Sequence, residues 1–413
     1  MEEWCHSRAT RRNQATPLSM GVRQTRASSV TPLDTSCNSR KDATVPPKRE
    51  RTLDRRTLNR TLLARQFLLE RRRAPVMRTI EHLVAMQAQE PRDPYVALWT
   101  RLHGFDAGHL SRHLERRKVA RMTLLRGTLH LATADDALAI RPMVQAAIEA
   151  TFFGSSPLRR AIDAVDVDEL VSFIRARLEE DPRTRAQVVR AIADRWPEVD
   201  ADALGYAMYL IPTVQVTPRG LWGRSGPSAF TTLESWLGRR PGTGRSPDAL
   251  LLRYLRAFGP ATPADAQAWS GLRGMRAVFE RLRPQLRVFR DEAGRELFDA
   301  PRAKIADPEV PAPVRFLPGY DNVVLAHKDR SRIAGLGTAM WTEVGWGSVL
   351  VDGFTSARWK IPRGSDVMEV EPFRRLTVAE RHAVEAEGRD LARFSVPGDH
   401  GDHEVSVRVR RGR

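Results

Sequence analysis

One pattern of elements recurs three times along the chain, and it constrains the fold more than any other feature of the sequence. Each time, apolar residues at helical spacing are followed by a short β-rich stretch bounded by glycine or other turn residues. Helices closed by a β-hairpin are the elements of a winged helix, which is a relative of the helix-turn-helix. The period is loose, about 70–90 residues, and this favours domain duplication over a solenoid. The sequence therefore predicts an α+β fold built from tandem winged helices.

The first copy contains four predicted helices and one hairpin. The helices are expected over 59–73, from Val76 to the stretch MQAQEP, over Tyr95–Leu102 and from His109 to about Lys118. The segment TLLRGTLHLAT then alternates, with Gly127 in its middle. This order of elements predicts the first winged helix.

The second and third copies repeat this order. In the second, helices are expected over 166–180, in RTRAQVVRAIADRW and over 201–210, with strands in VQVTPRGLWG and SAFTTL. In the third, a helix in LLLRYLRAFG ends at Gly259, another begins at Thr262 before Pro263, and MRAVFERLRPQLRVF and ELFDAP give a helix and a hairpin. From about residue 306 the chain is richer in β-strands, with candidates in VRFLPGYDNVVLAH, GSVLVDG and ARWKI, and a final helix is expected over Val378–Phe394.

These patterns predict five segments. They are an extension over 1–56, winged-helix domains over 57–155, 156–245 and 246–305, and a β-rich C-terminal domain over 306–413. The extension is rich in Ser, Thr, Pro and Arg, has 12 basic and 6 acidic residues, and lacks periodicity, which is typical of a disordered segment. It is either an over-called start, with Met20 as one alternative, or a basic arm that touches nucleic acid.

The charge of the chain makes a polyanionic partner plausible. Lys and Arg number 67 against 50 Asp and Glu, a net charge of +17. Most of the basic residues are Arg, so a GC-rich coding bias is an alternative explanation. Basic runs nevertheless fall on predicted helices and hairpins, where phosphate contact is expected. The candidates are Arg116, Arg117, Lys118, Arg121 and Arg126 in the first copy, and Arg330 and Arg332 near the C-terminal domain.

Several classes of site are excluded or unsupported by the sequence. The only cysteines, Cys5 and Cys37, lie in the extension, so the body has no disulfide framework and no Cys-based zinc site, which fits a reducing cytoplasm. No apolar run of about 18 residues predicts a membrane span, and no secretory signal is recognised. No metalloprotease motif, phosphate loop or dinucleotide fingerprint is present, and the cluster DHGDH over 399–403 is interpreted as a polar turn. We therefore expect no metal and no cofactor.

Two amides two residues apart, Gln87 and Gln89, form the sharpest local signal. On composition they are a polar helix end, since residues i and i+2 of a helix point to different sides of its axis. Three tryptophans, Trp99, Trp269 and Trp359, fall on predicted apolar faces and are expected in the core. Asp321 and Asn322 are expected to shape a turn.

The order and spacing of several segments resemble one known family. LLARQFLLERR, HLVAMQAQEPRDPYVALWTRL, RMTLLRGTLHLATADD, GPATPADAQAWSGL, LPGYDNVVLAHKDRSRI and VLVDGFTSARWKI together resemble the bacterial winged-helix DNA glycosylases of the azinomycin-resistance type (AlkZ), relatives of the crosslink-repair glycosylase YcaQ. The resemblance runs from about Leu58 to about Phe394 and leaves out the extension.

The resemblance implies a C-shaped arrangement of winged helices around duplex DNA and a monofunctional glycosylase without metal or cofactor. The implied reaction is hydrolysis of the N-glycosidic bond of N7-alkylated purines, including bulky adducts and interstrand crosslinks. The family's Gln-apolar-Gln catalytic motif is matched by Gln87, Ala88 and Gln89. RGTLH matches a segment beside the DNA, which implies that Arg126 and His130 lie near it, although a His paired within a strand is the alternative for His130.

Two interpretations of the function follow. The first is a glycosylase that acts on double-stranded DNA with alkylated purines, as a monomer in the cytoplasm at the bacterial nucleoid, for repair or for self-resistance to a DNA-alkylating natural product. The alternative is a non-catalytic winged-helix DNA-binding protein or transcriptional regulator. A regulator is expected to dimerise, and no heptad segment that would drive dimerisation is present.

Overall fold

The computed structural model describes residues 51–155, 157–242, 246–335, 345–362, 365, 367–395 and 406–410. By its contacts, Arg51–Arg413 forms one unit, separate from Met1–Glu50. The expected extension falls almost wholly outside the described residues, as does the DHGDH cluster. None of the helices in the described part is long and apolar enough to cross a membrane.

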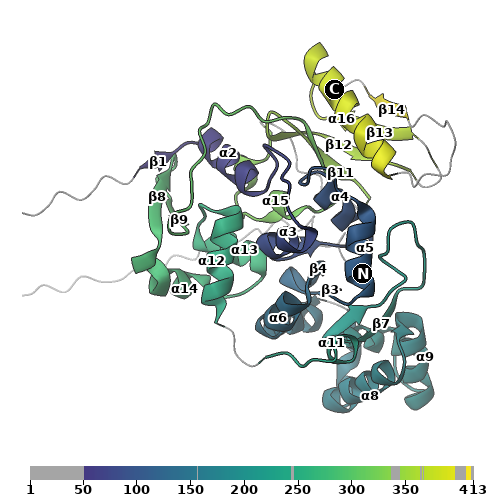
Figure 1. The fold of residues 1–413 in the computed structure, drawn as a ribbon. Coiled ribbons are helices and arrows are strands. Elements are labelled where there is room, and N and C mark those ends of the chain that lie inside the picture. The colour runs from purple at the N-terminus through teal and green to yellow at the C-terminus, as the bar shows by residue number, and fades with distance from the viewer. Residues whose placement is uncertain are drawn as a thin grey trace, which may run out of the picture. The chain divides into compact units, whose positions relative to one another are not determined.

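The first copy has its four helices, and all four end earlier than expected (Figure 1). The helices are α2 (Arg55–Arg65), α3 (Val76–Leu83), α4 (Asp93–Trp99) and α5 (Ala107–Glu115). The prediction that the first helix reaches residue 73 and the second reaches the MQAQEP stretch is wrong. Val84 has φ 70°, which breaks the second helix. The chain then extends and pairs with another strand.

A six-stranded sheet joins the hairpins of the first two copies. Its strand order is β2-β4-β3-β6-β7-β5. The strands are β2 (Met86–Gln87), β3 (Val119–Thr123), β4 (Leu129–Thr133), β5 (Arg183–Thr184), β6 (Thr213–Gln215) and β7 (Ala229–Thr232). β3 and β6 are linked through the antiparallel partners Met122 and Val214. Two predicted domains thus share one continuous sheet.

The second copy follows its predicted elements closely. The long helix α6 (Ala134–Ser155), which the sequence analysis did not anticipate, leads into it. The remaining helices are α7 (Leu158–Ala161), η2 (Ile162–Ala164), α8 (Val167–Glu180), α9 (Arg185–Arg195), α10 (Ala201–Leu204), η3 (Gly205–Tyr209) and α11 (Leu233–Leu237). Thr184 caps α9 through a capping box with Gln187, which explains why that helix begins where it does.

The third copy also has its expected helices and hairpin. They are α12 (Pro247–Phe258), α13 (Pro263–Ser270), α14 (Met275–Leu282), η4 (Arg283–Gln285), β8 (Arg287–Asp291) and β9 (Glu296–Asp299). Thr262 caps α13. The strand β1 (Thr52–Leu53) pairs in parallel with β8 through Thr52 and Arg290. The expected boundary at residue 56 is therefore wrong, because residues from 51 onward already belong to the folded part.

The C-terminal part is a five-stranded sheet covered by one helix. The strand order is β10-β11-β12-β13-β14, from β10 (Arg315–Leu317), β11 (Gly347–Val351), β12 (Phe354–Lys360), β13 (Val367–Pro372) and β14 (Ser406–Val409). Helix α16 (Val378–Ser395) packs against β14 and β10, as Figure 1 shows for β14. Only the start of VRFLPGYDNVVLAH is a strand, since Asp321 caps the short helix α15 (Asn322–Leu325), and η5 (Arg330–Arg332) follows.

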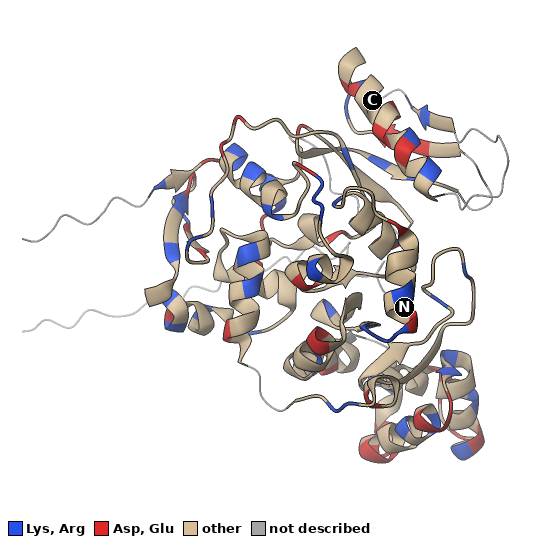
Figure 2. Ribbon diagram, in the orientation of Figure 1, with Lys and Arg blue, Asp and Glu red and all other residues tan. Residues whose placement is uncertain are grey.

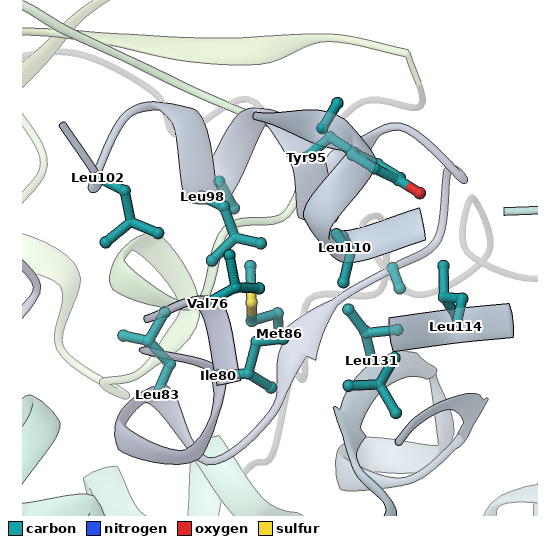
Figure 3. Packing of buried hydrophobic residues seen from close by; sticks show 14 residues of the cluster. Val76, Ile80, Leu83, Met86, Tyr95, Leu98, Leu102, Leu110, Leu114 and Leu131 are labelled. Carbon is teal, nitrogen blue, oxygen red and sulfur yellow. The ribbon is translucent and has the colours of Figure 1, made fainter. Parts of the chain in front are cut away.

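A buried apolar cluster holds β2 in place. Figure 3 shows Met86 among Val76, Ile80 and Leu98, with Leu131 of β4 nearby. Met86 is 4% exposed, so removing it from water favours this strand over a continued helix. Trp269 and Trp359 are buried as expected. The winged-helix assignment of the three copies and their C-shaped arrangement stay predictions.

Candidate active site

Gln87 lies on the strand β2 and Gln89 lies in the bend that follows it, and neither is at a helix end. Met86 and Gln87 pair antiparallel with Leu131 and His130 of β4, and Ala88 N donates to Leu129 O at 2.9 Å. The chain has thus left α3 before it reaches the two amides, and the expectation that they close a helix is wrong.

The side-chain amide of Gln87 is bonded at both ends. Its Oε1 accepts from Arg126 Nη2 at 2.9 Å, and its Nε2 donates to Thr128 Oγ1 at 3.2 Å. Because guanidinium groups only donate, the contact with Arg126 fixes which end of the amide is the oxygen. The Gln87 side chain, 5% exposed, is thus held in one orientation.

Gln89 is held differently, through its backbone. Arg121 Nε donates to Ala88 O at 2.9 Å, and Arg121 Nη2 donates to Gln89 O at 2.9 Å. The side-chain Oε1 of Gln89 is buried and has no hydrogen-bond partner within the described residues. Buried acceptors are normally satisfied, so this oxygen is available to a water or a ligand group.

Arg126 connects four parts of the fold at this site. It lies in η1 (Leu125–Gly127) with φ 57°, between β3 and β4. Besides Gln87, its guanidinium donates to Trp269 O and to Asn322 Oδ1, the latter at 3.0 Å. Burial, together with the positive charge of Arg330, lowers the pKa of Arg126 to about 10. Arg126 therefore remains charged at neutral pH.

Asn322 bridges the C-terminal part to the segment that carries the amides. Its Nδ2 donates to Ala85 O at 2.6 Å, while its Oδ1 accepts from Arg126. Asp321 beside it accepts from Arg101 at 2.9 and 2.8 Å and caps α15. The expected turn is present, but sequence analysis missed the link to Arg126 because no local pattern signals it.

His130 is fully buried on β4, which agrees with the alternative of a His paired within a strand. Its Nδ1 donates to Thr128 O at 2.9 Å, so Nε2 is an acceptor toward Arg126 Nη2 at 3.4 Å. Burial lowers the pKa of His130 to about 3, and Arg126 acts in the same direction. The imidazole is therefore neutral, and the expectation that His130 lies near the DNA stays a prediction.

The low pKa of His130 predicts a pH-dependent stability. The contribution of His130 to the free energy of unfolding is complete above the unfolded-state pKa of 6.5. It is lost as the pH falls toward about 3, because in this range only the unfolded chain takes up the proton. Between pH 7 and pH 5, His130 should lower the free energy of unfolding by about 2 kcal/mol.

Urea unfolding at pH 7 and pH 5 measures this change. The free energy of unfolding should fall less between the two pH values in His130→Gln than in the original chain. His382→Gln, on the exposed face of α16, is the control and should retain the full loss. Equal losses in all three proteins would contradict the assignment.

The predicted basic contacts divide into exposed and interior residues. Arg116, Arg117 and Lys118 are exposed at the end of α5, and Arg117 lies over the Trp236 ring at 4.6 Å. Arg121 and Arg332 are 3% and 6% exposed and donate to backbone carbonyls. The guanidinium groups of these two residues are used inside the fold, and their contact with DNA stays a prediction.

The positive charge is also more balanced than the sequence suggests. Figure 2 shows acidic and basic residues interspersed over α8 and α9. Of the basic run on α14 and the following hairpin, Arg281 pairs with Asp248 and Arg283 pairs with Glu296. Exposed pairs of this kind contribute little stability, but they reduce the charge that is free to meet a polyanion.

The site is built from neutral amides and one guanidinium. No group of three or more His, Cys, Asp or Glu residues that could hold a metal occurs in the described part. The nearest carboxyl groups in sequence are those of Glu90 and Asp93, and Asp93 Oδ2 accepts from Glu90 N at 3.3 Å. Burial raises the pKa of Asp93 well above its usual range. Such an arrangement can place a water and direct carbonyl oxygens at a developing positive charge.

A solved structure shares the fold of this chain. It is the Streptomyces sahachiroi DNA glycosylase AlkZ, with a TM-score of 0.62 and 22% sequence identity over 87% of this chain and 100% of that chain. At this identity the likeness shows the fold alone.

A family model assigns the chain to a protein family. The model of the AlkZ-like DNA glycosylases matches residues 80–394, and the chain belongs to this family. It is a DNA glycosylase, and its substrate is DNA. None of the curated proteins compared with the chain matches it. The family match favours the catalytic interpretation over a non-catalytic DNA-binding protein.

Proposed function

We propose that this glycosylase hydrolyses the N-glycosidic bond of N7-alkylated purines in duplex DNA, with Gln87 and Gln89 at the reacting centre. The substrates would include bulky adducts or interstrand crosslinks, in repair or in self-resistance to a DNA-alkylating natural product. The observation that carries the proposal is the pair of neutral amides two residues apart, Gln87 bonded at both ends and Gln89 with a buried acceptor that has no partner within the described residues.

The chemistry of the leaving group suits such a site. An N7-alkylated purine carries a positive charge, so it leaves as a neutral base without a general acid. The bond breaks through an oxocarbenium-like sugar, as in other glycosyl hydrolysis. The site then has to position a water and stabilise developing positive charge. A carbonyl oxygen can do both, whereas an amide cannot act as a base at neutral pH.

The two amides divide this work. Gln89 Oε1 has no partner within the described residues and is proposed to accept from the attacking water. Gln87 Oε1 is already bonded to Arg126, and its second lone pair can face the sugar. Gln87 is therefore the fixed amide and Gln89 the amide that receives the water.

The exposed basic residues are proposed to contact the DNA backbone. Arg116, Arg117 and Lys118 lie together at the end of α5 and no ion pair is described for any of them. Such contacts position a protein on DNA without reading its sequence. A single chain supplies the whole site, so we propose that the protein acts as a monomer.

Incubation with DNA containing N7-methylguanine tests the reaction class. We expect abasic sites to accumulate at the alkylated position, with no strand cleavage by the protein itself. The measurement is alkaline cleavage of the labelled strand after incubation, compared with the same duplex carrying guanine. Because guanine is a poor, neutral leaving group, the unmodified duplex should stay intact. Absence of abasic sites across methyl, bulky and crosslinked N7 adducts would refute the proposed substrate class.

A further inference from the structure

The guanidinium of Arg126 has only neutral partners. They are Gln87 Oε1, Asn322 Oδ1, Trp269 O and the neutral ring of His130. No carboxylate pairs with Arg126 within the described residues. A buried charge without a counter-ion is costly, even when neutral acceptors satisfy its hydrogens.

A second cation of the same kind lies within electrostatic reach. The charge of Arg330 lowers the pKa of Arg126, so the two guanidinium groups repel each other. Arg330 is half-buried, and no side-chain hydrogen bond or ion pair is described for it. The carboxylate of its neighbour Asp329 is taken by Arg295 at 2.6 Å.

This lack of an acid sets Arg126 and Arg330 apart from the other buried arginines. Burial lowers the pKa of Arg121, of Arg141 and of Arg332, and a nearby carboxylate opposes that change in each. Burial also lowers the pKa of Arg126 and of Arg330, and no acidic side chain opposes the change there. Two cations within electrostatic reach of each other and without an anion are a site that an anionic ligand would complete.

We propose that Arg126 and Arg330 together bind one phosphodiester of the DNA strand next to the target nucleotide, and that this phosphate is the counter-ion that the folded protein lacks. The proposal rests on the proposed placement of the reaction at Gln87 and Gln89. Guanidinium groups suit this ligand, because they remain charged and donate several hydrogen bonds to phosphate oxygens.

The phosphate would also couple binding to chemistry. Arg126 holds Gln87 Oε1, so fixing its guanidinium from the DNA side fixes the orientation of that amide. An unneutralised cation beside a developing oxocarbenium opposes its formation, and a bound phosphate cancels that opposition. Arg126 is therefore a positioning residue whose charge is compensated only when DNA is bound.

A charge-neutralisation cycle tests the site. A methylphosphonate, which is uncharged, replaces one phosphate at a time on either side of an N7-methylguanine. Equilibrium binding is measured for the original chain and for Arg330→Gln. Lys328→Gln is the matched control, because it removes the same charge from an exposed side chain of the same segment. Single-turnover excision is measured on the same duplexes.

At one phosphate position, we expect methylphosphonate to weaken binding of the original chain about tenfold. Arg330→Gln should bind the all-phosphate duplex about tenfold more weakly and lose nothing more at that position. For Lys328→Gln, the fold-loss of affinity caused by the substitution and the fold-loss caused by methylphosphonate should instead multiply at every position. Excision by the original chain should slow at the same position, because Gln87 is less firmly held.

Multiplicative losses for Arg330→Gln at every position, or unchanged binding by Arg330→Gln, would overturn the proposal. The binding arm does not depend on catalysis. If Arg330→Gln loses nothing more at one methylphosphonate position but no excision occurs, the phosphate site is retained and the proposed function is refuted. If excision occurs but the losses multiply at every position, the proposed function is retained and the phosphate site is refuted.

Discussion

Gln89→Ala is expected to slow excision of N7-methylguanine by about 10²–10³-fold in single-turnover assays, the loss typical of removing one preorganised polar group at a reacting centre. The buried Oε1 has no partner within the described residues, so its removal deletes the proposed water acceptor without breaking a described side-chain contact. Binding to undamaged duplex should stay largely intact.

Gln87→Ala should also slow excision greatly, because it frees the Arg126 guanidinium and removes the second carbonyl. The exposed Gln285 in η4 provides the matched control, and Gln285→Ala should retain the original rate. Unchanged single-turnover rates in both Gln87→Ala and Gln89→Ala would remove the assignment of the reacting centre to this segment.

Asp321→Ala should have the largest effect on stability. It leaves Arg101, which is 1% exposed, buried without its bidentate partner. Removing one partner of a buried ion pair costs about 3–5 kcal/mol, and the N-cap of α15 is lost as well. The measurement is the free energy of unfolding from urea titration.

The control is Asp135→Ala, which breaks the exposed pair with Arg239. That change should cost less than about 1 kcal/mol. Changing Arg101→Met together with Asp321→Ala should recover part of the loss, since the uncompensated charge is then gone. If Asp321→Ala costs no more than Asp135→Ala, the buried pair does not stabilise the fold as argued.

Local patterns predicted many elements well. The final helix was expected over Val378–Phe394 and spans Val378–Ser395, and Thr262 caps α13 where the Thr-Pro pair indicated a start. These features depend on neighbours within a few residues of one another. The family resemblance, based on ordered segments, was confirmed by the model that matches residues 80–394.

The errors arose where a distant strand decided the local structure. Apolar residues at Val84 and Met86 continue the helical spacing of α3, so periodicity extended the helix to the amides. The chain leaves the helix at Val84 because Met86 and Gln87 pair with Leu131 and His130. Strand pairing also gives Arg121 of β3 a role that no local pattern signalled, because its guanidinium holds the backbone of the amide segment.

The sequence by itself determined the order of helices and hairpins, the family, and the two amides as candidates. These follow from periodicity, capping and ordered motifs along the chain. Only the tertiary structure decided that Gln87 lies on a strand with Gln89 in the bend after it. It also decided that Arg126 holds Gln87 and Asn322, from positions 39 and 196 residues away along the chain. Such contacts arise from packing and strand pairing between remote segments, and no local pattern of residue types specifies them.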